Sequence, residues 1–303
     1  MGSSDSPQIS FLIVNWNGLP VIKECLQSIE ATCSKLSYEV LIADNNSTDG
    51  SVPMIKKLFP NAKIMQNKKN LFFAAPTNAL SRQAKGNFFM LMNNDIILKK
   101  NALPRLLKAL LESKHTGAAV PQLLFPDGRI QPSCRRLPTL FSLAISGTRL
   151  DKFFNKNSWK MKDWDHCGAR YVEQPMMSAM LIKRKCWLDV GELDEERFPL
   201  YFNDVDWCKR ALAKGWKIRF EPSAQAVHLE AWSGKKLGFK QALYSSKGMY
   251  NYFRKHHVKT IFSPQWPLLA ILVLSFLGVK GASVGAKKLK EQLFILSKSA
   301  SGA

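Results

Sequence analysis

The chain is short of acidic residues and lacks the phosphate-binding and metal-binding motifs of several common protein classes. Its 303 residues carry 23 Asp and Glu against 44 Lys and Arg, a formal net charge of +21. No GxGxxG segment follows the first apolar run, and neither GxxxxGKS nor GxxxxGKT occurs, so the dinucleotide-binding and P-loop classes lose their main support. The six cysteines form no CxxC pair, which argues against a zinc site and favours a reduced cytosolic protein.

The amino terminus and the charge balance indicate where the protein works and what it binds. The first eight residues are polar and show neither the basic nor the apolar region of a signal peptide, which predicts a cytoplasmic protein. The excess of cations favours an anionic partner, namely nucleic acid, an acidic membrane surface or a phosphorylated substrate. No RNA-binding or helix-turn-helix pattern is present, so nucleic acid is not expected.

The most informative stretch is an apolar run that ends in a carboxylate. Phe88 to Met92 are followed by Asn93, Asn94 and Asp95, which predicts a buried strand with an acid at its tip. In open α/β sheets ligands bind beyond the carboxyl ends of the strands, so Asp95 is expected at a functional edge. A hard oxygen ligand there suits Mg²⁺ or Mn²⁺. The alternative is an Asx turn that precedes a helix at Asn101.

Apolar runs alternate with helical patterns through the first half of the chain. Besides the run that begins at Phe88, residues 9–14, 38–43 and 63–66 are expected strands. Residues 21–29, 54–59, 77–84 and 101–113 are expected helices. Strands that alternate with helices and end in polar residues indicate an α/β protein with a mostly parallel, Rossmann-like sheet flanked by helices.

Three polar motifs in a fixed order carry a resemblance to a known enzyme family. They are IVNWNG at residues 13–18, ADNNSTDGS at residues 43–51 and LMNND at residues 91–95. Together they resemble the opening half of family 2 glycosyltransferases, which have the GT-A fold, and in particular bacterial rhamnosyltransferase-like members. The resemblance covers roughly residues 9–232.

The resemblance implies a donor site for a nucleotide-diphosphate sugar at the ends of the first strands. Asp44 would contact the nucleotide base and Asp49 would help to shape the nucleotide pocket. The other donor-binding candidates are Asn15, Asn17, Asn46 and Asn78. Asp95 would match the last acid of the family's DxD motif, which binds the metal that bridges the donor diphosphate. This chain departs from the pattern at Asn93, where a strict DxD has Asp, and at Phe72, where glycine is usual.

Motifs in the second half imply a catalytic base and a second metal ligand. Asp204, within YFNDVDWCKR at residues 201–210, matches the family's base, and Asn203 replaces the acid that usually precedes it. A helix start favours an ionised carboxylate, and the alternative is that Asp204 and Asp206 only complement the helix dipole. His228 resembles the histidine that completes the metal site, although a lone histidine is more often structural.

Further polar residues are expected near the diphosphate or the acceptor. The adjacent pair Arg135 and Arg136 can hold phosphate oxygens, and the alternative is ordinary solvated charge. The other members of this group are Asn93, Asn94, Asn203 and Asp206. The basic and aromatic residues 149–171 are expected to form a loop near the acceptor.

The composition changes after residue 232. From there Glu291 is the single acid among many lysines, and residues 260–279 carry no charge. The apolar run 266–279 is too short to span a bilayer core of roughly 30 Å, so an interfacial or re-entrant helix flanked by lysines fits better. The alternative is a buried helix packed on the catalytic domain. We expect a catalytic domain over residues 7–232 and a helical, membrane-associating region over residues 233–303.

The sequence therefore predicts an inverting, metal-dependent glycosyltransferase on the cytoplasmic face of the inner membrane. It would transfer a sugar, with rhamnose suggested by the resemblance, to a glycan or a lipid-diphosphate-linked saccharide in cell-surface polysaccharide synthesis. An anionic membrane surface is a further expected partner. One rival is a non-enzymatic basic protein on the same fold. Another is a degenerate transferase that binds nucleotide sugar without turnover, because Asn93 and Asn203 both replace acids.

Overall fold

The protein consists of two compact units, residues Met1–Trp232 and Ser233–Ala303. The computed structural model describes residues 7–33, 36–145, 159–161, 163–229, 239–258 and 260–278. The expected acceptor loop at residues 149–171 lies outside the described residues over 149–158 and at position 162.

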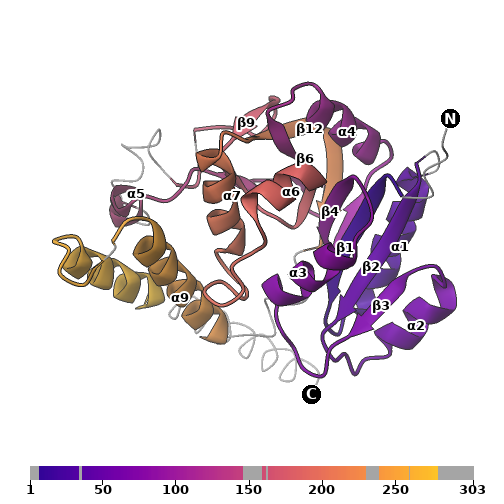
Figure 1. Ribbon diagram of the computed structural model, residues 1–303, viewed down its shortest axis with the longest axis horizontal. Helices are drawn as coiled ribbons and strands as arrows, with labels where there is room; N and C mark the ends of the chain where they lie inside the picture. Colours follow the sequence, from indigo (N-terminus) through magenta and orange to yellow (C-terminus); the bar gives the residue numbers. More distant parts are fainter. Residues whose placement is uncertain are drawn as a thin grey trace, which may run out of the picture. The chain divides into compact units, whose positions relative to one another are not determined.

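A ten-stranded sheet forms the centre of the first unit (Figure 1). Its strands are β1 Ile9–Asn15, β2 Tyr38–Asp44, β3 Lys63–Gln66, β4 Phe88–Asn93, β5 Ile96–Leu98, β6 Thr116–Leu124, β7 Ile130–Gln131, β9 Arg170–Val172, β11 Ala179–Lys183 and β12 Lys217–His228. The path through the sheet is β3-β2-β1-β4-β11-β6-β12-β5, with β7 paired to β6 and β9 paired to β12. A second, two-stranded sheet contains β8 Cys134–Arg135 and β10 Gln174–Pro175.

The direction of the strands confirms the expected parallel arrangement in the first half of the sheet. In the second half the sheet also contains antiparallel pairs. Strands β3, β2, β1 and β4 are parallel neighbours, and β12 is parallel to β6. Strand β11 is antiparallel to both β4 and β6 and joins these two groups. The carboxyl ends of β1, β2 and β4 therefore meet at one edge, as the sequence predicts.

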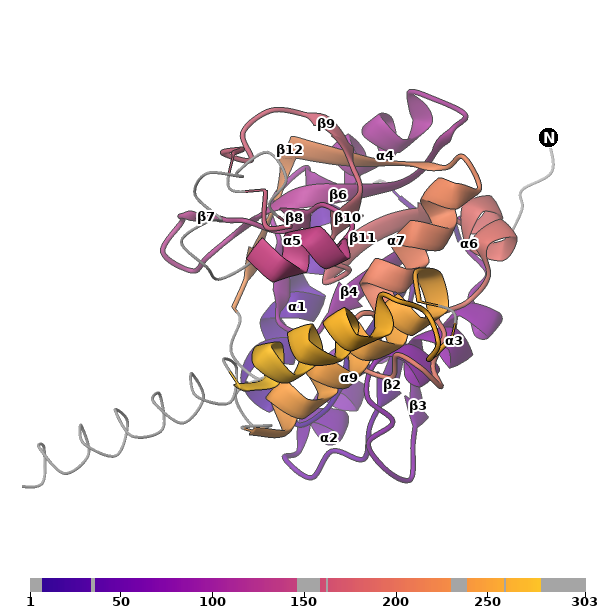
Figure 2. The ribbon, with the colours of Figure 1, turned by 90° about the vertical axis from the view of Figure 1, so that its left-hand side faces the viewer.

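Helices cover both faces of the sheet (Figure 2). In the first unit they are α1 Leu19–Thr32, α2 Ser51–Leu58, α3 Ala74–Gln83, α4 Ala102–Leu111, α5 Leu140–Ile145, α6 Arg184–Val190 and α7 Asn203–Ala213. Phe11 and Ile13 of β1 belong to a core with residues of α1, α2 and α4, whereas Leu12 belongs to a core with residues of α3, α6 and α7. Alternate side chains of the strand thus fill two separate cores.

A short strand that the sequence analysis did not expect follows Asp95 directly. Residues Ile96–Leu98 form β5 directly after a turn at Asn94 and Asp95. The alternative of a turn before a helix at Asn101 agrees with this, because Asn101 is the N-cap of α4, but the strand between them was not foreseen. Strand β5 pairs in antiparallel fashion with the end of β12, and Ile96 is the register partner of His228. The chain therefore crosses to the far edge of the sheet immediately after Asp95.

In the second unit, α9 Phe239–His256 is followed by helical turns over residues 266–278. Ile271 and Leu274 project from these turns with 61% and 67% of their surface exposed, and Phe262 just before them is 90% exposed. Over the part of the chain that the structure describes, no helix combines the length and the apolar character needed to cross a membrane.

Candidate functional site

The ends of three parallel strands place the first group of predicted site residues together. Asn15 of β1 is the register partner of Asp44 of β2, and Val14 is the partner of Asn93 of β4. Polar side chains that lie far apart in the sequence therefore share one edge of the sheet.

These polar side chains form a buried hydrogen-bond network. Asn15 Nδ2 donates to Asp44 Oδ1 at 2.9 Å, and Asn94 Nδ2 donates to Asn15 Oδ1 at 2.9 Å. The hydroxyl of Ser47 also donates to Asp44 Oδ1, and its backbone N–H donates to Asp44 Oδ2. Asn15 and Asp44 have no exposed surface. The network joins the ends of the three strands, and the contact of Asp44 with a base stays a prediction.

Asp49 holds the two loops that border this network. Its Oδ2 accepts the backbone N–H of Leu19 at the start of α1, and its Oδ1 accepts that of Ser51 at the start of α2. Burial by itself raises the pKa of Asp49, but these hydrogen bonds outweigh it and leave the pKa below the ordinary value. Asp49 is therefore an ionised carboxylate that fixes the loop shape.

The remaining donor-site candidates fall into two groups. Asn17 and Asn46 adopt left-handed backbone conformations, with φ of 49° and 61°, and Asn17 Oδ1 accepts the N–H of Thr48. Asn78 lies elsewhere, in the middle of α3, where its amide bonds to Leu193 and Glu195. The contacts of Asn78 connect α3 to the loop after α6, and its role in donor binding stays a prediction.

Phe72 occupies a backbone conformation that favours glycine. Its φ is 64°, a left-handed conformation that glycine adopts easily, which agrees with the glycine that is usual at this position in the family pattern. Asn45 Nδ2 donates to the carbonyl oxygen of Phe72, and Asn70 Oδ1 accepts the N–H of Phe72. The side chains of Asn45 and Asn70 thus hold Phe72 in a strained backbone conformation near the carboxyl end of β2.

Asp95 and His228 face each other at the end of the network. The pairing of β5 with β12 brings His228 Nε2 to 3.5 Å from Asp95 Oδ1, and the N–H of Leu229 donates to the carbonyl oxygen of Asp95. Both side chains are more than nine-tenths buried. Asp95 Oδ1 has no hydrogen-bond partner. A buried carboxylate oxygen without a partner is costly, so the pair is suited to a cation.

Gln131 determines which nitrogen of His228 faces Asp95. Its Oε1 lies 3.0 Å from His228 Nδ1, deep in the protein. With Nδ1 as the donor, Nε2 keeps its lone pair and can act as a metal ligand. Among the described residues, no cluster of three or more His, Cys, Asp or Glu side chains could hold a metal. Asp95 and His228 bring one carboxylate and one imidazole together, and both are ligand types that Mn²⁺ accepts.

Asp204 lies in the first turn of α7 beside the small sheet of β8 and β10. Its Oδ2 accepts a hydrogen bond from Gln174 Nε2 at 3.0 Å, and its Oδ1 accepts the N–H of Val205 at 2.9 Å. Burial raises the pKa of Asp204 above its ordinary value, and the positive charge of Arg135 opposes this only in part. The helix start alone favours a low pKa, so burial reverses the sequence expectation.

The two adjacent arginines have different surroundings. The Arg135 guanidinium lies over the ring of Trp159, 5.3 Å from its centre, and acts electrostatically on Asp204. Arg136 forms two hydrogen bonds with the carboxylate of Asp163, at 3.0 Å and 2.7 Å. Arg135 is therefore the better placed of the two to meet a substrate anion, because the charge of Arg136 is balanced within the protein.

Asn203 and Asp206 take part in local structure. Asn203 Nδ2 donates to the carbonyl oxygen of Leu200, and its Oδ1 accepts the N–H of Asp204. Asp206 is fully buried and pairs with Arg210, which donates in turn to the carbonyl oxygens of Val190 and Glu192. Asp206 lies in the first turn of α7, as the dipole interpretation requires, and its ion pair with Arg210 also anchors α7 to the loop after α6.

Two residues of the site escaped the sequence analysis as functional candidates. Gln131 contacts His228, and Gln174 contacts Asp204. Both stand in two-residue strands, which carry too little periodicity to be recognised. The chain from Gln174 leads directly to Ser178, whose carbonyl oxygen accepts the N–H of Asn93. The surroundings of Asp204 and of Asp95 are connected in this way.

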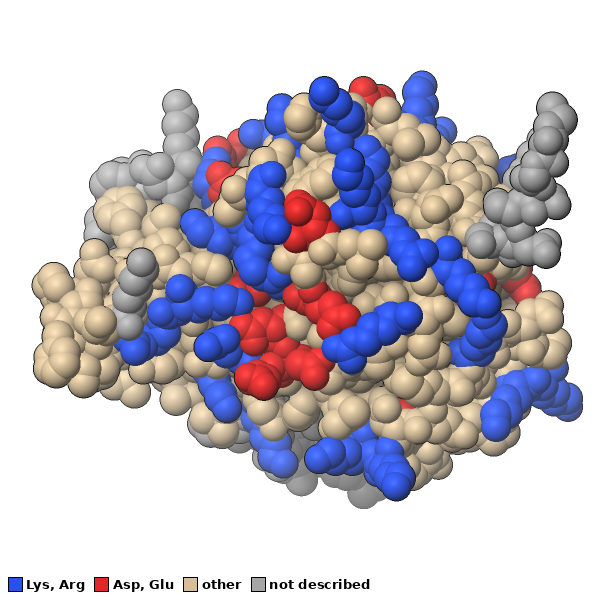
Figure 3. Space-filling model, in the orientation of Figure 1, with Lys and Arg blue, Asp and Glu red and all other residues tan. Residues whose placement is uncertain are grey.

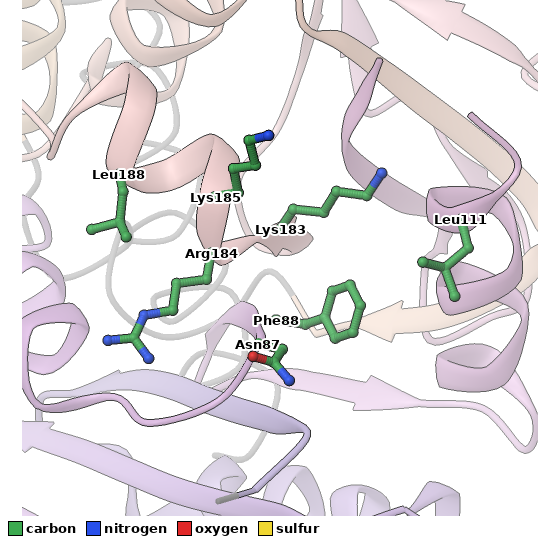
Figure 4. Close-up of a pocket in the computed structure, with 7 residues that line it drawn as sticks. All are labelled: Asn87, Phe88, Leu111, Lys183, Arg184, Lys185 and Leu188. Carbon is green, nitrogen blue, oxygen red and sulfur yellow. The ribbon is translucent and has the colours of Figure 1, made fainter. Parts of the chain in front are cut away.

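A separate pocket of about 460 Å³ lies at the opposite edge of the sheet (Figure 4). Its lining includes Lys183, Arg184 and Lys185, where β4 begins and β11 ends. Lys183 donates to the carbonyl oxygen of Ser113, and Arg184 donates to that of Lys85. None of the predicted site residues lines this pocket. Figure 3 shows that lysine and arginine side chains are distributed over the visible face, around a central group of acids.

Comparison with known families gives a match over more than half of the chain. Residues 10–168 match the model of the family described as glycosyl transferase family 2. An N-acetylglucosaminyl-diphospho-decaprenol L-rhamnosyltransferase of Mycobacterium tuberculosis is 25% identical over 276 residues, which cover 86% of this chain and 89% of that protein. A poly(ribitol-phosphate) beta-glucosyltransferase of Bacillus spizizenii is 31% identical over 103 residues, covering 32% of this chain and 16% of that protein.

Solved structures share the fold at low sequence identity. A mannosyltransferase of Pyrobaculum calidifontis in complex with GDP-Man and Mn²⁺ superposes with a TM-score of 0.56 at 15% identity, over 97% of this chain and 81% of that one. GalNAc-T7 with UDP, GalNAc and Mn²⁺ superposes with a TM-score of 0.60 at 16% identity, over 88% and 51%. The architecture of this chain is that of GT-A proteins.

Proposed function

Because the chain belongs to glycosyl transferase family 2, as a rhamnosyltransferase-like member, we propose that it transfers a sugar with inversion, using a nucleotide-diphosphate sugar and a divalent cation. The observation that carries this proposal is the pair of Asp95 and His228. Two buried side chains whose atoms lie 3.5 Å apart, one with an unpartnered oxygen, stand just beyond the carboxyl end of β4, and ligands of open α/β sheets bind beyond such strand ends.

Asp95 and His228 would hold Mn²⁺ or Mg²⁺. When bound, the cation supplies positive charge that stabilises the leaving diphosphate. Two solved structures of the same fold contain Mn²⁺ beside a nucleotide or nucleotide sugar, which supports Mn²⁺ here. Asn93 supplies an amide in place of a carboxylate, so the cation would be bound more weakly than by a strict DxD motif.

Asp204 acts as the general base. Its carboxylate accepts the proton of the acceptor hydroxyl while the hydroxyl oxygen bonds to the anomeric carbon and the bond from that carbon to the diphosphate breaks. Burial raises the pKa of Asp204, which makes the ionised carboxylate a stronger base for the proton of the acceptor hydroxyl. The charge of Arg135 acts on Asp204, so it would also help to neutralise an anionic group of a substrate bound beside Asp204.

The donor nucleotide would bind along the network at the ends of β1 and β2. In this arrangement Asp49, Asn17 and Asn46 shape the loops, and Asn15, Asn94 and Asp44 form the floor. The buried hydrogen bonds fix these groups before substrate binds, which reduces the cost of ordering the site.

We infer that the sugar is rhamnose from a thymidine-diphosphate donor and that the acceptor is a saccharide on a lipid diphosphate. The support is the mycobacterial relative, whose name gives an L-rhamnosyl transfer to N-acetylglucosaminyl-diphospho-decaprenol. The product would enter cell-surface polysaccharide synthesis.

A lipid-linked acceptor places the enzyme at a membrane. We assign residues 7–232 to the catalytic domain and residues 233–303 to a region that binds the anionic cytoplasmic face of the inner membrane. Phe262, Ile271 and Leu274 are exposed in a segment whose sequence is flanked by lysines, which supports this assignment because such a segment can enter the lipid interface.

The experiment that tests the function is a transfer assay with a matched donor panel. Purified protein should convert a lipid-diphosphate N-acetylglucosamine acceptor to a rhamnosylated product with dTDP-rhamnose and Mn²⁺. A thermal-shift screen of nucleotide sugars, with and without Mn²⁺, identifies the donor independently of the acceptor. Donor binding without product from any acceptor would favour a degenerate transferase. The replacement of two acids of the family pattern by Asn93 and Asn203 is consistent with that alternative.

A further inference from the structure

Gln174 is a buried glutamine whose amide faces a carboxylate. It has no exposed surface, and it stands in β10, where its register partner is Arg135 of β8. Its Nε2 lies 3.0 Å from Asp204 Oδ2 and 3.3 Å from the carbonyl oxygen of Pro175. Both neighbours of the nitrogen accept hydrogen bonds, so the amide can adopt only this orientation while Asp204 is charged.

We propose that Gln174 is a positioning residue that fixes the orientation of the Asp204 carboxylate and favours its charged form. The proposal rests on the proposed function, in which Asp204 is the base. With Gln174 on Oδ2 and the N–H of Val205 on Oδ1, each oxygen accepts one fixed hydrogen bond and keeps a lone pair for the incoming proton. The side chain of Asp204 is thereby prevented from rotating away from the acceptor.

The unused end of Gln174 supports a functional role. Gln174 Oε1 is buried and has no hydrogen-bond partner. A residue selected only to fill space in a small sheet would be apolar, because a buried amide with an unsatisfied oxygen is unfavourable. The unsatisfied Oε1 of Gln174 destabilises the fold, and the hydrogen bond from its Nε2 to Asp204 gives a reason for a glutamine at this position.

The groups around Asp204 come from three elements. The charge of Arg135 on β8 favours the charged carboxylate. A hydrogen bond donated to a carboxylate also favours its charged form, and Gln174 on β10 donates one. Within α7, the N–H of Val205 also favours the charged form, whereas the thiol of Cys208 is itself so buried that its pKa is raised. Gln174 is the uncharged side chain that donates a hydrogen bond to Asp204, so replacing it removes that bond without altering a formal charge.

The test measures the titration of Asp204 directly in the full-length protein. In protein with carboxyl-¹³C aspartate, the Asp204 signal is the one lost in Asp204→Asn. Gln174→Met keeps the length and removes the donor, so the midpoint of that signal should rise by about one pH unit. Gln174→Glu adds a like charge and should raise it further. Gln122→Met is the control, because Gln122 is also a buried glutamine but bonds to His166 and Gln225.

Activity separates this inference from the proposed function. In transfer assays the acidic limb of kcat/KM should move to higher pH in Gln174→Met, and the KM for donor should stay unchanged. A midpoint within about 0.3 unit of the wild-type value, with lowered thermal stability as the sole effect, overturns the positioning role. If the midpoint moves but Asp204→Asn transfers sugar normally, the base assignment fails and the contact between Gln174 and Asp204 stands.

Discussion

His228 Nε2 lies 3.5 Å from Asp95 Oδ1, although 133 positions separate the two residues in the chain (228 − 95 = 133). The register of β5 against β12 produces this proximity, because Ile96 pairs with His228 and the N–H of Leu229 bonds to the carbonyl oxygen of Asp95. Backbone hydrogen bonds on either side fix the separation of the two side chains. Side chains held in this way would need little reorganisation to bind a cation between them.

The first prediction concerns this pair. Asp95→Asn keeps the shape of the side chain but removes its charge, so Mn²⁺ should no longer strengthen the binding of a nucleoside diphosphate. Calorimetric titration of UDP, GDP and dTDP, in Mn²⁺ and in EDTA, measures the effect. Asp127→Asn serves as the control, since Asp127 is an exposed turn carboxylate paired with Arg129. Equal Mn²⁺ dependence in Asp95→Asn and wild type would exclude Asp95 as a ligand.

The second prediction concerns turnover by Asp204→Asn. Removal of the base should lower kcat by about 10²- to 10⁴-fold, and donor affinity should change little because the hydrogen bonds of Asp204 and of Asp44 go to different partners. Steady-state kinetics and donor titration on one preparation give both quantities. Activity within about threefold of wild type would remove Asp204 from the mechanism.

The third prediction is a rise in stability from the same substitution. The pKa of Asp204 is raised in the folded protein, so the proton bound there stabilises the fold below the unfolded-state pKa. That contribution is lost as the pH rises through the folded-state pKa, and at neutral pH the buried charge is unfavourable. Asp204→Asn should therefore melt at or above the wild-type temperature at pH 7.5, with the difference vanishing below about pH 4. A large fall in melting temperature at pH 7.5 would contradict the pKa direction.

The fourth prediction concerns the close packing of Gly18. A Cβ atom at this position would stand within 2.3 Å of both Asn15 Oδ1 and Asn94 Nδ2. Gly18→Ala should separate this hydrogen-bonded pair and lower the free energy of unfolding by about 1–3 kcal/mol. Gly168→Ala is the control, because open space surrounds Gly168. Urea unfolding curves measure both, and equal stability of the two variants would mean that the network tolerates displacement.

The fifth prediction concerns the exposed apolar side chains of the second unit. The double variant Ile271→Ser with Leu274→Ser should bind anionic vesicles at least about tenfold more weakly than wild type. Cosedimentation at low and high salt measures this, because attraction of the basic residues is screened by salt. Leu111→Ser with Leu188→Ser is a matched control, as those side chains are 60% and 68% exposed. Equal loss in both double variants would assign the effect to general hydrophobicity.

The sequence by itself determined the architecture of the first four strands and the order of the polar motifs. Apolar runs of strand length, each followed by a polar loop and a helical pattern, are local signals. They predicted β1, β2, β3 and β4 within one residue of their ends. A carboxylate directly after such a run must lie at the edge of the sheet, so the position of Asp95 was also accessible from the sequence.

The tertiary structure alone decided which polar residues meet and what they do. The pairing of β5 with β12 joins Asp95 to His228, and the two-residue strands β8 and β10 bring Arg135 and Gln174 to Asp204. Strands this short have no periodicity that a sequence can show. The tertiary structure also reversed one expectation: a helix start lowers the pKa of Asp204, but burial is a property of the whole fold and raises it.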